Sequence, residues 1–279
     1  LAQADVPAYM ATLQGLVGIE SGSRDLEGLQ RIADVVAGRL RGAGMQVEQK
    51  STSAPDFHPQ LKGAKLGPMV YATRSGTGTK KVLLIAHMDT VYQRGMGAKQ
   101  PFRVDGDRAY GLGIADDKQG VALILHVVDL LNRLGATDYA QLGVLINSDE
   151  EIGSPGSGAF ITQLGSEYDA VFSFEGGGSA AANGFDSVRL ATSSIAIVEM
   201  KVTGKASHAG AAPHLGRNAL YELSHQMLKS RHFGDPAKGL QIHWTVASAG
   251  GSRNVIPAEA TAVADVRSLT NAAAAQAGT

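Results

Sequence analysis

With 279 residues, of which 44% are hydrophobic and 18% charged, the chain has enough apolar material for one large core or two. Its 25 basic and 26 acidic residues leave no net field to attract nucleic acid or anionic lipid, and no apolar run reaches the ~18 residues of a membrane span. We therefore expect a soluble protein with no nucleic-acid partner and no membrane partner.

The absence of cysteine excludes disulfides and thiolate metal ligands. The sequence starts at Leu1 rather than at a methionine, which suggests trimming, as of a signal peptide. The compartment therefore stays open between the cytoplasm, the periplasm and the outside of the cell.

The first two thirds of the chain alternate between helical and strand patterns. Apolar residues between Leu29 and Leu40 repeat at helical spacing, and a second, more apolar helix is expected over Lys118 to Leu134. The expected strands are Gln46 to Gln49, Met69 to Ala72, Lys81 to Ala86, Gln141 to Asn147 and Tyr168 to Phe174. The last three are nearly continuous apolar runs, which are typical of a largely parallel sheet buried on both faces. This pattern predicts an α/β catalytic domain over residues 1–192.

A second domain is predicted over residues 193–279, after a loop of small residues at 176–182. It reads as a strand, a helix, two strands and the start of a helix, at Ile195 to Val202, Asn218 to Lys229, Leu240 to Ala247, Thr261 to Arg267 and Asn271. A ferredoxin-like α+β domain has one more strand, so we expect an incomplete domain of that kind.

Four acidic or histidine-bearing segments follow the apolar runs: His87-Met88-Asp89, Asp116-Asp117, Asp149-Glu150-Glu151 and Glu175. Because the carboxyl ends of parallel strands meet at one edge of a sheet, these side chains are expected to converge. Imidazole and carboxylate are zinc ligands, and two zincs need a bridging carboxylate and terminal ligands on each side. The sequence therefore predicts a metal site capable of hydrolysis.

Each segment alone has an ordinary explanation. A histidine after a strand is more often simply hydrogen-bonded, and Asp117 is explained by the helix dipole that it faces. Three successive acids can form a solvated turn, although their repulsion favours bound cations. If the site is real, Asp89 orients the His87 ring, and one of the two adjacent glutamates binds metal while the other transfers a proton.

Read together, HMDTV, YGLGIADDKQG, NSDEEIGSPGS, SFE and GKASHAGAAP resemble the metallopeptidase family that contains glutamate carboxypeptidase, aminoacylase and succinyl-diaminopimelate desuccinylase. Glutamate carboxypeptidase is the most similar in these motifs, which extend from about Leu16 to Arg267. The resemblance implies a dizinc hydrolase with a catalytic domain and a lid domain that forms a homodimer.

The resemblance also implies individual roles. Asp116 bridges both metals, His87 and Glu175 complete one metal, Glu151 serves the other, and Glu150 is the general base. The Asp116-Asp117 peptide bond is expected to be cis. His208 resembles a lid histidine that stabilises the oxyanion in a partner's active site, and otherwise it is a loop histidine. Asn254 and Arg267 match positions that hold substrate, although Arg267 can also be a surface cation.

One family feature is absent from the sequence. The fifth metal ligand of the family is a histidine after the lid, and none of His58, His126, His214, His225, His232 and His243 lies in a matching motif. The metal at Glu151 is therefore expected to lack one ligand in this chain.

Our leading hypothesis is a metal-dependent exopeptidase that removes a C-terminal residue, with glutamate preferred, from small peptides or N-acyl amino acids by attack of a metal-bridged hydroxide. Two divalent ions are expected, with zinc favoured over cobalt or manganese. The alternatives are an N-acyl-amino-acid deacylase or desuccinylase of the same family, and a catalytically incomplete fragment or binding protein.

Overall fold

The computed structural model describes residues 1–56, 61, 63–176, 192–270 and 272–273. The chain forms two compact units, Leu1–Ser179 and Ala180–Thr279. The small-residue loop expected at 176–182 lies almost entirely outside the described residues, as does Asn271, where a final helix was expected. The domain boundary between residues 192 and 193 stays a prediction.

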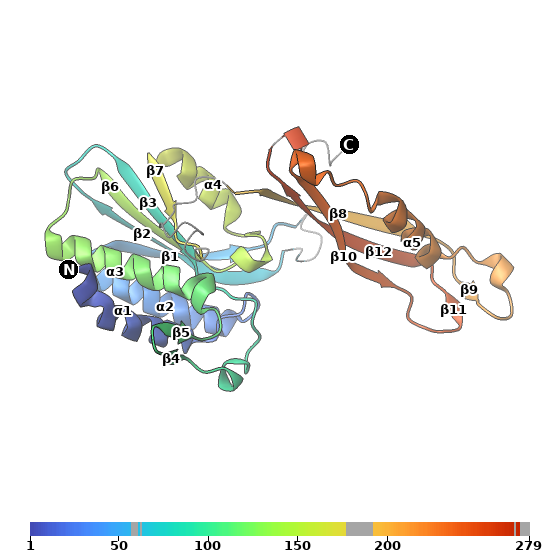
Figure 1. The fold of residues 1–279 in the computed structure, drawn as a ribbon, viewed down its shortest axis with the longest axis horizontal. Coiled ribbons are helices and arrows are strands. Elements are labelled where there is room, and N and C mark those ends of the chain that lie inside the picture. Colours follow the sequence, from blue (N-terminus) through green and yellow to red (C-terminus); the bar gives the residue numbers. More distant parts are fainter. Residues whose placement is uncertain (57–60, 62, 177–191, 271, 274–279) are drawn as a thin grey trace. The chain divides into compact units, whose positions relative to one another are not determined.

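The first unit contains a mixed five-stranded sheet (Figure 1). In spatial order its strands are β1 (Gln46–Ser53), β2 (Lys65–Ser75), β6 (Gln141–Asn147), β3 (Lys81–His87) and β7 (Ala170–Ser173). β3 runs parallel to both β6 and β7, whereas the pairs β1–β2 and β2–β6 are antiparallel. The predicted α/β class is confirmed, and the three apolar runs form the parallel part of the sheet.

Helices cover both faces of this sheet (Figure 1). On one face lie α1 (Ala2–Val17), α2 (Leu26–Gly42) and α3 (Gln119–Leu134), and α4 (Gly158–Glu167) lies on the other. Within β3, Leu84 and Ala86 pack against the first group, whereas Leu83 packs with Leu164 of α4. Since successive strand residues point to opposite faces, burial on both sides requires the continuous apolar run seen in the sequence.

Short elements complete the first unit. β4 (Arg103–Asp105) and β5 (Arg108–Tyr110) form a hairpin, 3₁₀ turns span Gly97–Lys99 and Glu150–Ile152, and a π-helical turn spans Ile114–Lys118. The sequence analysis did not anticipate α1, α4 or this hairpin. In α1, Leu13 and Leu16 are the only buried residues, so its apolar periodicity is weak.

The second unit is an antiparallel sheet covered by a helix. Its three strands lie in the order β10 (Leu240–Ala249), β12 (Glu259–Ser268) and β8 (Ser194–Thr203), and α5 (Ala219–Ser230) packs on one face through Leu223 and Ala262. The strands β9 (Ser207–His208) and β11 (Val255–Ile256) form a separate pair, and 3₁₀ turns span Pro213–Leu215 and Pro236–Lys238. This order matches the predicted strand, helix, strand and strand, while the ferredoxin-like identity stays a prediction.

Among the described residues, no helix combines the length and apolar character needed to cross a bilayer.

The N-terminus of α5 provides a stability test. The Asn218 side chain accepts hydrogen bonds from the backbone N–H groups of Leu220, at 3.0 Å, and Tyr221, at 3.3 Å. Asn218→Ala should lower the free energy of unfolding by about 1 kcal/mol, because these N–H groups lose their acceptor. Asn218→Asp keeps the acceptor and should unfold at nearly the wild-type urea concentration. Equal urea midpoints for the alanine variant and the wild type would contradict the capping role.

Candidate metal centre

The sheet topology brings three chain segments together at one edge. β3 ends at His87, which lies beside Asn147 at the end of β6, and β7 lies on the other side of β3. The turn after β6 carries Glu150 and Glu151, and Glu175 follows β7 by two residues. Parallel strands place these groups at the same carboxyl edge, as the sequence predicted.

The His87 ring lies at the centre of this group. Its Nε2 atom is 2.9 Å from Asp116 Oδ1, 3.7 Å from Glu175 Oε2 and 3.9 Å from Glu150 Oε2. The ring is only 1% exposed, whereas the three carboxylates are about half exposed or more. The imidazole is therefore fixed in the protein while the carboxylates around it remain open to solvent.

Asp89 is fully buried and joins the segments around His87. Its Oδ1 atom is 3.3 Å from His87 Nδ1 and accepts a hydrogen bond from the Glu150 N–H at 3.1 Å. Its Oδ2 atom accepts from the Glu151 N–H at 3.2 Å and from the Ser23 hydroxyl at 2.8 Å. These are the contacts of a carboxylate that orients a metal-binding histidine, which supports the predicted role.

The Asp116–Asp117 peptide bond is cis, as expected. Asp117 is buried and accepts hydrogen bonds from the backbone N–H of Gly120, at 3.2 Å, and of His87, at 3.4 Å. The first contact satisfies a free N–H at the start of α3, which agrees with the helix-terminal explanation of Asp117.

The three acids after β6 have different surroundings. Asp149 is buried and accepts hydrogen bonds from the N–H groups of Gly156 and Ser157, at 2.7 and 3.0 Å, and from the Ser157 hydroxyl. Asp149 is thus satisfied by protein donors and needs no cation. Only Glu150 and Glu151 remain available to a metal or a substrate.

The pKa values show that the site concentrates negative charge. Burial and the charge of Asp116 raise the pKa of Glu151 to about 7, and burial, followed by nearby charges, also raises the pKa values of Glu150 and Glu175. Burial lowers the pKa of His87, but Asp89 and the other nearby acids outweigh this effect and raise it to about 10. A divalent cation would relieve this repulsion in place of the proton.

The donor atoms fit such a cation. Two groups of three have ligand atoms within 4.8 Å of one another: His87, Asp116 and Glu151, and His87, Asp117 and Glu175. The site of predicted ligands is therefore assembled around His87. Sequence reasoning did not count Asp117 as a candidate ligand, because its place at a helix start already explained an acid there.

Three predicted site residues lie in the second unit. His208 belongs to β9, the Asn254 carbonyl accepts a hydrogen bond from the Ala209 N–H at 2.9 Å, and Arg267 lies in β12. Arg267 Nε donates to Asp265 at 2.8 Å, and this hydrogen bond raises the arginine pKa. Asn254 is thus placed next to the His208 segment, and Arg267 has a carboxylate partner within its own strand.

One histidine and several carboxylates at the carboxyl edge of a mixed α/β sheet define the class of metal-dependent hydrolases. The chain belongs to Peptidase family M20/M25/M40, whose sequence profile matches residues 83–276. The predicted family resemblance is thereby confirmed.

Relatives agree with this membership. Carboxypeptidase G2 of Pseudomonas sp. (strain RS-16) is 44% identical over 265 residues, which cover 95% of this chain and 61% of that protein. A p-aminobenzoyl-glutamate hydrolase homolog of Haemophilus influenzae is 42% identical over 71 residues, or 25% of this chain and 17% of that protein. This chain thus spans about three fifths of the length of carboxypeptidase G2.

A solved structure shows the same fold. The M20 family metallo-carboxypeptidase Sso-CP2 of Sulfolobus solfataricus superposes with a TM-score of 0.72 at 18% identity, covering 94% of this chain and 71% of that one.

The orienting role of Asp89 predicts a change in metal affinity. Asp89→Asn should weaken zinc binding about 10- to 100-fold, because the amide replaces one acceptor oxygen with a donor facing backbone N–H groups. Zinc affinity is measured by competition with a chromophoric chelator. Asp107→Asn, at an exposed acid in the β4–β5 turn, should bind zinc as the wild type does. Equal affinities for all three proteins would show that Asp89 does not tune the site.

Proposed function

We propose that the protein is a zinc-dependent exopeptidase that releases a C-terminal glutamate from small peptides or N-acyl amino acids. The observation that carries this proposal is the convergence of His87, Asp116 and Glu151 beside Glu150. The 44% identity to a protein named a carboxypeptidase supports the reaction. The shorter match to a protein named as a homolog of p-aminobenzoyl-glutamate hydrolase supports glutamate as the residue released.

His87, Asp116, Glu151 and Glu175 would hold two divalent ions, with zinc favoured over cobalt or manganese. When bound, such ions polarise a carbonyl and make a neighbouring water molecule more acidic. Asp89 keeps the imidazole in position through its contact with Nδ1.

Glu150 is the proposed general base. Its carboxylate lies 3.9 Å from His87 Nε2 and is 45% exposed, so it faces the same space as the candidate ligands and remains accessible to substrate. It would take a proton from the attacking water and deliver it to the leaving amine. Its neighbour Glu151 is in one of the ligand groups, so the turn after β6 supplies both functions.

His208 is proposed to stabilise the oxyanion. Its Nδ1 atom accepts hydrogen bonds from the N–H groups of Gly210, at 3.2 Å, and Ala211, at 3.0 Å. These donors favour the tautomer with its proton on Nε2, which leaves Nε2–H free to donate to a developing negative charge. Asn254 and Arg267 are proposed to hold the substrate, with the Arg267 guanidinium exchanging or sharing Asp265 for a substrate carboxylate.

We also propose a homodimer formed through the second unit. β8 lies at an edge of the three-stranded sheet, and its Ile195 and Ile197 side chains are 62% and 71% exposed. An exposed apolar edge strand favours pairing with another strand.

Glu150→Gln tests the general base. The amide cannot accept the proton, so kcat should fall about 10²- to 10⁴-fold while bound zinc, measured by atomic emission, stays at the wild-type amount. Glu167→Gln, at the end of α4, is a matched control and should keep wild-type kcat. A Glu150→Gln enzyme with wild-type kcat would remove Glu150 from the mechanism.

The function is tested with purified full-length protein on matched substrates. N-benzoyl-glutamate should be hydrolysed much faster than N-benzoyl-glutamine, and 1,10-phenanthroline should abolish the activity until zinc is restored. Cobalt and manganese are added in parallel to compare the metals. N-acetyl- and N-succinyl-leucine represent the deacylase alternative. The proposal fails if these two are turned over while glutamate-terminated substrates are untouched.

A further inference from the structure

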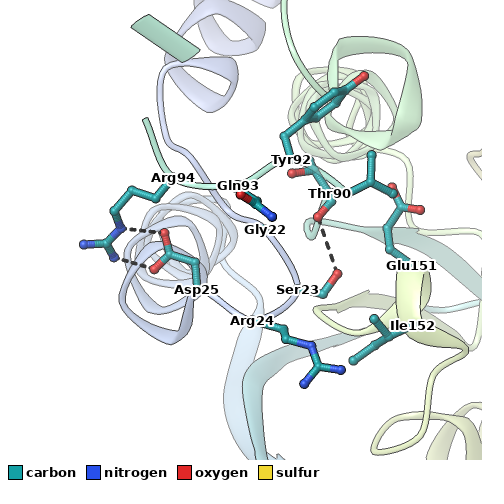
Figure 2. Close-up of a pocket in the computed structure, with 11 residues that line it drawn as sticks. Gly22, Ser23, Arg24, Asp25, Thr90, Tyr92, Gln93, Arg94, Glu151 and Ile152 are labelled. Carbon is teal, nitrogen blue, oxygen red and sulfur yellow. Dashed lines mark hydrogen bonds and ion pairs between the residues drawn. The ribbon is translucent and has the colours of Figure 1, made fainter. Parts of the chain in front are cut away.

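A cavity of about 620 Å³ lies in the first unit beside the candidate metal ligand Glu151. Figure 2 shows its lining, which comes from residues 22–25, residues 90–94 and the pair Glu151 and Ile152. The segment at 90–94 directly follows Asp89, so the wall of the cavity continues from the metal centre. A group bound in this cavity would therefore lie next to the proposed site of hydrolysis.

The two long segments are fastened to each other. The Ser23 N–H donates to the Thr90 carbonyl at 3.1 Å, and the Thr90 N–H donates to the Ser21 carbonyl at 3.0 Å. Gly22 lies so close to this strand that an added Cβ would be 2.3 Å from the Tyr92 carbonyl oxygen. The backbone that presents Arg24 is consequently held in a defined position relative to the metal centre.

The two arginines of the cavity differ in their partners. Arg94 pairs with Asp25 and with Glu27, and these carboxylates raise its pKa, so its charge is already compensated. Arg24 is exposed and makes no hydrogen bond or ion pair with any residue in the part of the chain that the structure describes. In Figure 2 its side chain extends toward Ile152 and away from Arg94.

We infer that Arg24 is a specificity-determining residue that pairs with a carboxylate on the acyl part of the substrate. This inference rests on the proposed function and names the substrate class: glutamate carrying a dicarboxylic acyl group, such as succinyl. A guanidinium offers two parallel N–H donors that match a carboxylate. Val91 and Ile152 in the same lining supply apolar surface for the carbon chain between the amide and that carboxylate.

N-succinyl-glutamate and N-butyryl-glutamate test this inference, because both acyl groups have four carbons and only one ends in a carboxylate. Wild-type protein should prefer the succinyl substrate in kcat/KM. Arg24→Gln should lower that preference about 10- to 100-fold, mainly through KM, and leave the butyryl substrate within about twofold of wild type. Arg24→Lys should restore part of the preference. Arg31→Gln, at an exposed arginine of α2 outside the cavity, should leave it unchanged.

An unchanged preference in Arg24→Gln, or an equal loss on both substrates, overturns the inference. If wild-type protein hydrolyses neither substrate, the proposed function fails and the inference is decided by calorimetric binding of the same two compounds. Tighter binding of N-succinyl-glutamate by wild type, lost in Arg24→Gln, would still support the carboxylate site. Equal binding by both proteins would reject it.

Discussion

The interaction on which the candidate site depends is the set of hydrogen bonds to the buried Asp89 carboxylate. Burying a carboxylate is costly unless its oxygens are paired, and here the protein supplies the donors. Ser23 comes from the segment before α2, and Glu150 and Glu151 donate from the turn after β6. Because the same carboxylate contacts His87, the position of the imidazole is coupled to the position of both candidate glutamates.

The sheet makes this coupling possible. His87 and Asn147 are register partners in the parallel pair β3–β6, so the turns that follow both strands begin at the same height. Helices on both faces exclude water from the strands, and the polar groups therefore gather beyond the strand ends. The carboxylates close to His87 raise one another's pKa values, and the resulting density of negative charge suits a divalent cation.

The two cavity arginines illustrate how local pairing separates structural from functional charge. Arg94 and Asp25 form an ion pair, and Asp25 also caps α2 by accepting the Gly28 N–H at 2.9 Å. That arginine stabilises the wall of the cavity. Arg24, its neighbour in space but not in pairing, retains its hydrogen-bonding capacity for a ligand. Sequence alone gives both residues the same exposed, basic character.

The sequence by itself determined the strand and helix order of both units and the identity of the segments that form the centre. It did so because burial on both faces imposes continuous apolar runs, and because chemistry-bearing residues follow those runs directly. It missed α1 and α4, whose buried residues are too few for a clear helical period. Only the tertiary structure decided which acids are free. Asp149 is consumed by backbone donors, Asp117 lies near the ligands as well as at a helix start, and Ser23 reaches Asp89 from 66 residues away. Hydrogen bonds between distant segments leave no local pattern in a sequence, and they are what gives identical carboxylates different roles.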